Sequence, residues 1–167
     1  MVSRRVVQLA SLGWGFGVVM LVMQSPLAQR PEFEPPVRST SDPQALAAAV
    51  LRDADRFSSA SVGITGVTPP EVLAWQVVAR SEQGDSVFRH LLATGSVPTR
   101  LYALAGLRLT NPAAYAAGAK RMRIDGGFVS VVRGCIVMDV AVDSVLDEIR
   151  DGRWTAEFLA GRSLPDR

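Results

Sequence analysis

A thiol and an imidazole are the first candidates for chemistry in this chain, because each occurs only once. Cys135 is the single cysteine and His90 is the single histidine. A thiol hydrolase needs one of each, with the imidazole taking the proton of the thiol. Cys135, however, precedes Ile136 and Val137, and a cysteine in such a β-branched segment is usually a small buried hydrophobic residue. We therefore predict a buried, structural Cys135, and the Cys135–His90 pair remains the alternative.

A single cysteine also excludes a disulfide within the chain. In an oxidising compartment such a thiol is either buried and inert or available for pairing between chains. A dimer crosslinked through Cys135 is thus a further possibility, and the sequence leaves the oligomeric state open.

Four aspartates near the carboxyl end recur at intervals of four residues, namely Asp139, Asp143, Asp147 and Asp151. On one continuous helix they would form a stripe of carboxylates able to hold a hard cation. A change from strand to helix near Val142 interrupts the stripe, so the shared face is reduced to Asp143 and Asp147, with Asp151 at its end. We interpret Asp143 as a helix N-cap and the other two as solvated residues. A metal-assisted site made of these three acids is the alternative.

Other catalytic signatures are missing from the sequence. It contains no phosphate-binding loop, no GxSxG elbow and no HExxH pair, and one histidine cannot build a multi-histidine metal site. We therefore expect no cofactor and no resident metal.

The amino-terminal residues 1–28 have the layout of a secretory signal peptide. Arg4 and Arg5 precede an uncharged, mostly apolar run over residues 6–23, and Ala28 offers a small residue at the exit. We predict cleavage there and a periplasmic or secreted protein. The alternative is an inner-membrane anchor through residues 6–23, which come close to the roughly 20 apolar residues that span a bilayer. Membrane contact is then expected only through an uncleaved leader.

The charge balance argues against nucleic acid as a partner. The full chain has 18 basic and 16 acidic residues, and the leader holds two of the arginines and no acid. The remainder is formally neutral, with one short basic run at residues 120–123. Such a run is typical of a solvated helix face, whereas nucleic-acid binding calls for a broader basic patch.

The chain divides into three parts. Residues 1–28 form the leader, and residues 29–42 are rich in Pro and Ser/Thr without a hydrophobic period, which predicts an extended linker. Residues 43–162 are long enough for a single globular domain with its own core.

Local signals within that domain predict mostly helix. Asp42, Ser96 and Asn111 stand where they can cap helices, and Thr68 with Glu71 forms a potential capping box. The segment from residue 97 or 98 to residue 109 is apolar almost all round, which predicts the central buried helix. Residues 58–67 are expected to be a loop or a short extended piece.

The pattern becomes β-like after the glycine pair at 126–127. Residues 128–132 and 135–140 are dense in β-branched side chains, and Arg133-Gly134 between them predicts the turn of an antiparallel hairpin. Two strands alone are marginal, so they must pack on the helices or find a third strand. The predicted fold is α+β and mostly α, a compact bundle of about five to seven helices with a short hairpin near residues 128–140.

Two segments also carry a resemblance. Residues 100–115, which include Leu101-Tyr102-Ala103-Leu104, and the later Gly134-Cys135-Ile136-Val137 are similar to segments of a group of exported bacterial proteins. The group has a secretion leader or a lipid anchor and no known activity. The resemblance implies a bacterial envelope setting and transfers no catalytic role, and this chain lacks the leader cysteine of the lipid-anchored members.

The sequence as a whole favours an exported, non-catalytic helical domain that binds a protein or a component of the cell envelope. The alternative is a thiol-dependent or metal-assisted hydrolase that uses Cys135 with His90, or the acids Asp143, Asp147 and Asp151.

Overall fold

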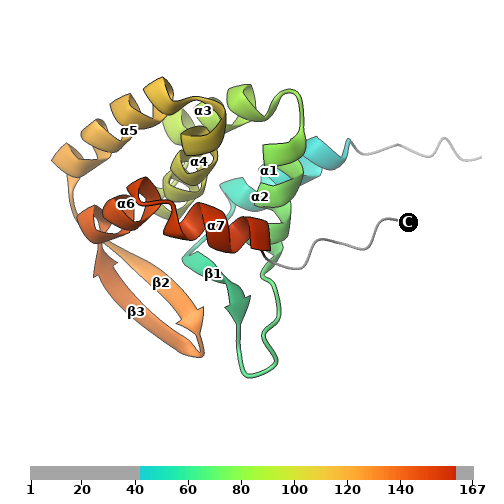
Figure 1. The fold of residues 1–167 in the computed structure, drawn as a ribbon, viewed down its shortest axis with the longest axis vertical. Helices are drawn as coiled ribbons and strands as arrows, with labels where there is room; N and C mark the ends of the chain where they lie inside the picture. Colours follow the sequence, from blue (N-terminus) through green and yellow to red (C-terminus); the bar gives the residue numbers. More distant parts are fainter. Residues whose placement is uncertain (1–41, 161–167) are drawn as a thin grey trace, which may run out of the picture. The chain divides into compact units, whose positions relative to one another are not determined.

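Seven helices and a three-stranded sheet make up the part of the chain that the computed structural model describes, residues 42–160 (Figure 1). The predicted α+β, mostly helical fold is confirmed. The elements in chain order are α1 (Pro43–Arg52), β1 (Phe57–Val62), α2 (Pro70–Arg80), α3 (Gly84–Thr94), α4 (Val97–Thr110), α5 (Pro112–Asp125), β2 (Phe128–Gly134), β3 (Ile136–Ala141), α6 (Val142–Arg150) and α7 (Arg153–Ala160). The predicted leader, nearly all of the predicted linker and the end of the predicted domain lie outside the described residues.

Three of the helices begin at the caps predicted for them. The side chain of Asp42 accepts a hydrogen bond from the amide of Gln44 (3.0 Å) at the start of α1. At the start of α5, the side chain of Asn111 accepts from the amide of Ala114 (3.0 Å). Ser96 caps α4 more weakly, with 3.4 Å between its hydroxyl oxygen and the amide nitrogen of Thr99. Each cap supplies an acceptor to an amide that has no partner inside its helix.

Two other predicted caps are wrong, and in both cases the helix begins at a different residue. Helix α2 starts at Pro70 with Pro69 as its N-cap, which leaves Thr68 one residue too far upstream to cap it. Helix α6 starts at Val142, directly after β3, so Asp143 lies inside the first turn and caps nothing. Neither helix has a side-chain cap.

The sheet has the order β1-β2-β3, with β1 parallel and β3 antiparallel to β2. The predicted hairpin is therefore present and has the third strand that it needed, since residues 57–62 supply β1. Its turn lies one residue later than predicted, because Arg133 pairs with Ile136 and the connection is Gly134-Cys135. Gly134 has a positive φ of 55°, a conformation that two-residue hairpin turns need and glycine adopts at no steric cost.

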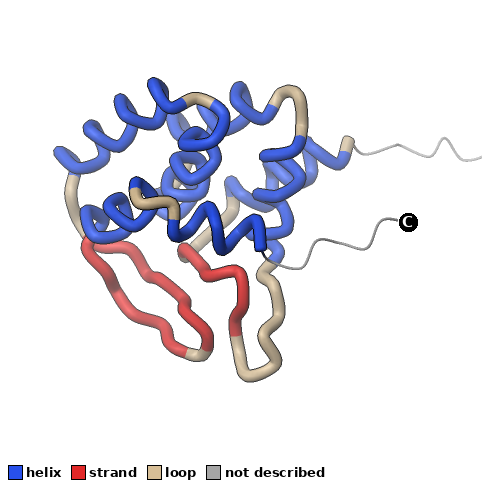
Figure 2. The backbone as a smooth tube through the Cα atoms, viewed as in Figure 1, coloured by secondary structure: helices blue, strands red, loops and turns tan. Residues whose placement is uncertain are grey.

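Helix α4 is the central buried helix, as predicted. Its side chains from Leu101 to Leu107 are buried, and it packs against α3, α5, α6, α7 and β1. Figure 2 shows the helices around it and the strands gathered at one end of the domain. Beside α4, an aromatic cluster joins the sheet to the helices and consists of Phe57, Trp75, Tyr102, Trp154 and Phe158.

Candidate functional site

The structure does not bring the predicted thiol and imidazole together. Cys135 lies in the turn between β2 and β3, whereas His90 is on α3, and these elements are at opposite ends of the domain (Figure 1). Both residues are exposed. The prediction of a buried Cys135 is therefore wrong, because the shifted turn moves it out of the strand and into solvent. The Cys135–His90 hydrolase alternative has no geometric basis.

Exposure predicts how Cys135 reacts. We expect an alkylating reagent at neutral pH to label Cys135 in the native protein within about threefold of the rate in urea, because the thiol is exposed in the turn. Replacing His90→Ala should leave the rate unchanged, since the imidazole is too remote to take the proton of the thiol. Mass spectrometry of time points measures both rates. Protection in the native state, or slower labelling of H90A, would contradict this placement.

The aspartates at the carboxyl end are matched by arginines. Asp147 forms ion pairs with Arg123 and with Arg150, the latter at 3.0 Å, and Asp143 lies 3.8 Å from the guanidinium of Arg123. The hydrogen bond from Arg123 lowers the pKa of Asp147. Asp151 pairs with Arg150 at 3.2 Å. The carboxylates thus have cationic partners already.

Within residues 42–160 no three His, Cys, Asp or Glu side chains are grouped so that they could hold a metal ion. Asp139 belongs to β3 and is separated from the α6 acids by the strand-to-helix transition, as predicted. The metal-assisted alternative through Asp143, Asp147 and Asp151 therefore has no geometric basis among the described residues.

A group of exposed apolar side chains lies instead on the hairpin. We call it the hairpin patch, and it consists of Phe128, Ile136, Val137 and Met138. Ile136, Val137 and Met138 follow one another along β3 from the turn, whereas Phe128 begins β2 opposite Ala141, at the other end of the hairpin. In a strand with one covered face only alternate side chains are exposed, but here both faces of β3 meet solvent. Sequence reasoning recognised these residues as strand-forming and missed that nothing in the described chain covers them.

A contact between Arg133 and two other residues fixes the hairpin to the helices. Arg133 forms an ion pair with Glu148 of α6, and its guanidinium carbon lies 4.8 Å from the centre of the Trp154 ring. Trp154 in turn donates a hydrogen bond from Nε1 to the Glu148 carboxylate (2.8 Å). These three side chains come from β2, α6 and α7, so they hold the turn end of the hairpin to two helices.

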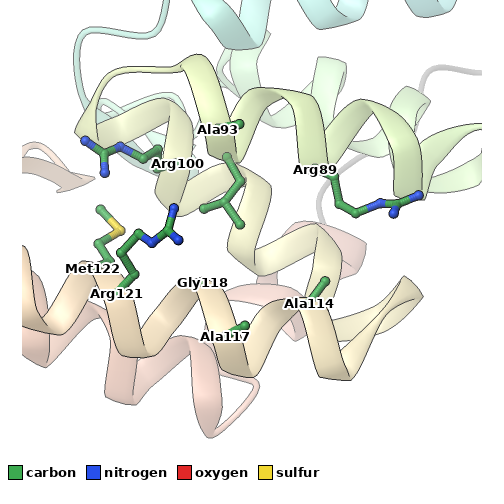
Figure 3. Close-up of a pocket in the computed structure, with 9 residues that line it drawn as sticks. Arg89, Ala93, Arg100, Ala114, Ala117, Gly118, Arg121 and Met122 are labelled. Carbon is green, nitrogen blue, oxygen red and sulfur yellow. The ribbon is translucent and has the colours of Figure 1, made fainter.

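A pocket of about 330 Å³ opens between α3, α4 and α5. Its lining residues are Arg89, Leu92, Ala93, Arg100, Ala114, Ala117, Gly118, Arg121 and Met122. Figure 3 shows the guanidinium groups of Arg100 and Arg121 at the end of the pocket near Met122, whereas that of Arg89 points away at the other end. The three arginines come from three different helices, so their spacing in the sequence could not reveal the pocket.

The arginines of this pocket differ in their partners. Arg89 pairs with Asp85 (2.8 Å) and Arg100 with Asp125 (3.3 Å). The Nε of Arg100 is buried and has no hydrogen-bond partner among the described residues. Within residues 42–160, Arg121 forms no ion pair either. The pocket therefore combines an apolar lining with uncompensated positive charge at one end.

Comparisons of the chain with protein-family models, with curated proteins and with solved structures find no match. Within the described residues no helix has the length and apolar character needed to cross a membrane. The anchor considered for residues 6–23 lies outside this part of the chain.

Proposed function

We propose that this protein is an exported, non-catalytic interaction domain whose β3 strand binds an extended segment of a partner protein. The observation that carries the proposal is the hairpin patch, in which Ile136, Val137 and Met138 expose apolar side chains on β3 at the edge of the sheet. Monomeric proteins usually protect such strands with charges, proline, bulges or a covering element, because an unprotected strand pairs readily with another chain.

The edge of β3 is available along its length. The strand pairs with β2 from Ile136 to Ala141, and no described strand lies on its other side. A partner segment added there would form main-chain hydrogen bonds, while its alternate side chains contact Ile136, Val137 and Met138. Ile136 and Met138 would serve one face of the added strand, and Val137 the other.

The hairpin is also held in place before any partner binds. The Arg133–Glu148–Trp154 contact fixes β2 to α6 and α7. A strand that is already ordered loses little conformational entropy on binding, which leaves more of the interaction energy for affinity.

Charge indicates which segment fits. Asp139 is the only charged residue in β3, it is exposed, and it forms no ion pair within residues 42–160. An extended segment with alternating apolar residues and a Lys or Arg opposite Asp139 would match both features. A second copy of β3 would instead bring a second acid and no base to this edge.

The exported setting rests on residues 1–28, and the proposed linker of residues 29–42 would separate the domain from the leader. An envelope location is consistent with a strand that acts on other proteins there. The partner that we propose is a protein with an extended, apolar segment that contains a basic residue.

Selection of peptides tests the proposal. A library of random linear peptides displayed on phage is panned against the purified full chain, and enriched peptides are measured against Val137→Lys and Val67→Lys. Val67 is a suitable control, because its exposed fraction of 59% matches the 57% of Val137 while it lies beyond β1, at the edge of the sheet opposite β3, where it bridges to Val62. We expect enriched peptides to alternate apolar residues around a Lys or Arg, and V137K to weaken them about tenfold or more, because it removes an apolar contact and repels their base.

Three results would count against the proposal. They are peptides that bind V137K as tightly as V67K, a library without any enriched peptide, and a concentration-dependent dimer that V137K abolishes. The last would make a second copy of the chain the occupant of β3.

A further inference from the structure

We propose that the pocket between α3, α4 and α5 binds the carboxylate of a single-chain aliphatic acid, with the head group at Arg100 and Arg121 and the chain along α5. This site is separate from β3 and does not depend on the function proposed for that strand.

The charge at one end of the pocket calls for an anion. Arg121 has no ion pair within the described chain, and Arg100 shares its charge with Asp125 at 3.3 Å, a longer contact than the 2.8 Å between Arg89 and Asp85. An exposed guanidinium without a charge partner at the edge of an apolar pocket can bind an anion.

The geometry of the donors favours a carboxylate. A guanidinium is a planar fork of N–H donors that can bind both oxygens of a carboxylate at once. Arg100 comes from α4 and Arg121 from α5, and Figure 3 shows their guanidinium groups at the same end of the pocket. Two forks at one end can hold one anionic group between them.

The remainder of the pocket is suited to an aliphatic chain. Leu92 and Ala93 line it from α3, and Ala114, Ala117 and Gly118 line it from α5. Small residues on α5 leave room above that helix, while Met122 closes the end beside the arginines with a flexible apolar side chain (Figure 3).

The volume limits the size of the ligand. About 330 Å³ is near the lower end of the roughly 300–1,000 Å³ that is usual for ligand pockets. One short or medium chain suits this space, whereas the two acyl chains of a phospholipid do not. We therefore choose a medium-chain fatty acid over a lipid head group.

Decanoate is the probe for the test. The protein is purified without detergent and titrated with decanoate below its micelle concentration, and two-dimensional NMR follows the backbone amides. We expect saturable binding at one site, with shifts concentrated in α3, α4 and α5. Decanol has the same chain without the charge, so its affinity should be lower than that of decanoate by about tenfold or more. Decyl phosphate distinguishes a carboxylate site from a general anion site.

Three substitutions locate the site. Arg121→Gln should weaken decanoate about tenfold, because it removes the unpaired cation. Ala117→Leu should abolish binding by filling the pocket from an exposed position on α5. Arg80→Gln is the matched control, since Arg80 is an exposed arginine on α2 that does not line the pocket. Thermal melting of each variant separates a loss of binding from a loss of folding.

The proposal is overturned if decanol binds as tightly as decanoate, if decyl phosphate binds and decanoate does not, or if R121Q and R80Q behave alike. Unchanged binding by A117L, with shifts outside these helices, would place the ligand elsewhere. None of these outcomes depends on whether β3 binds a peptide.

Discussion

Replacing Gly106→Ala lowers the free energy of unfolding by about 3 kcal/mol, at the upper end of what overpacking of a core usually costs. Gly106 lies in the buried helix α4, where it faces Phe88 of α3. A Cβ on residue 106 would lie 2.2 Å from Cε2 and 2.4 Å from Cζ of the Phe88 ring. Because that ring is fully buried, it can move only by displacing its own neighbours. An alanine normally stabilises a helix interior relative to glycine by up to about 1 kcal/mol. A loss of stability in G106A would therefore show that the clash with Phe88 outweighs this gain.

Gly118→Ala is the matched control for Gly106→Ala. Gly118 is also inside a helix, but its added Cβ would meet the methyl ends of Leu92 (2.6 Å) and Leu104 (2.9 Å). A leucine end can turn to another rotamer at modest cost, whereas a buried ring edge cannot. We therefore expect a smaller loss for G118A than for G106A.

Urea unfolding and thermal melting measure the difference, and G106A should melt on the order of 10 °C below the native protein. Adding Phe88→Leu to G106A should cost less than the sum of the two single changes, because it removes the atoms that clash. G106A with native stability, or strict additivity with F88L, would contradict the close packing of α3 on α4.

The parts of the fold that the sequence predicted depend on signals within a few residues of one another. Asp42 and Asn111 each cap a helix whose first turn follows at once, and a proline is in the first turn of both helices. The apolar run of α4 likewise predicts burial on every side without knowledge of its neighbours. Such signals depend only on neighbouring residues, so tertiary packing does not change the structure that they predict.

The parts that it missed depend on pairing between distant segments. Residues 57–62 become β1 because they pair in parallel with β2, which lies beyond four helices in the chain. Parallel pairing requires such a long crossover, and residues 58–67 alone show only a weak tendency to be extended. The same applies to the turn of the hairpin, where the pairing of Arg133 with Ile136 moved Cys135 out of the strand.

The hairpin patch and the pocket could not be predicted from the sequence for a related reason. Hydrophobic pattern identifies Ile136 and Val137 as strand residues, but only the packed structure shows that no element within residues 42–160 covers them. The pocket is assembled from arginines on three helices, and the basic residue Arg121 was predicted to belong to a solvated helix face. Its exposure agrees with that prediction, while its place beside an apolar cavity depends on how α3, α4 and α5 meet.

The aromatic cluster should be even more sensitive than the contact at Gly106. Replacing Phe158→Ala is expected to cost about 3–5 kcal/mol, the usual range for truncating a buried phenylalanine. The Phe158 ring is fully buried, and its centre lies 5.2 Å from that of Trp75 and 5.7 Å from that of Tyr102. It also lies 5.8 Å from Phe57 of β1 and 5.8 Å from Trp154. The Phe158 ring of α7 thus packs beside β1, α2 and α4 together.

The adjacent residue supplies the control for Phe158→Ala. Leu159 follows on the same helix but is 49% exposed, so Leu159→Ala removes a smaller apolar group from the surface and should change stability by less than about 1 kcal/mol. Both variants keep the hydrogen bond that the side-chain Nε2 of Gln76 donates to the backbone carbonyl of Phe158 (2.6 Å), so the comparison isolates the ring.

Loss of the Phe158 ring should also be felt in the sheet before the whole domain unfolds. Phe57 would lose one of its aromatic contacts, and Glu157 of the same helix would hold the amide of Ala60 (2.9 Å) less firmly. Native-state hydrogen exchange should therefore show faster exchange in β1 and α7 of F158A than in α3. Uniform acceleration throughout the domain would mean that α7 is not a separate support of β1, and native stability of F158A would contradict the cluster itself.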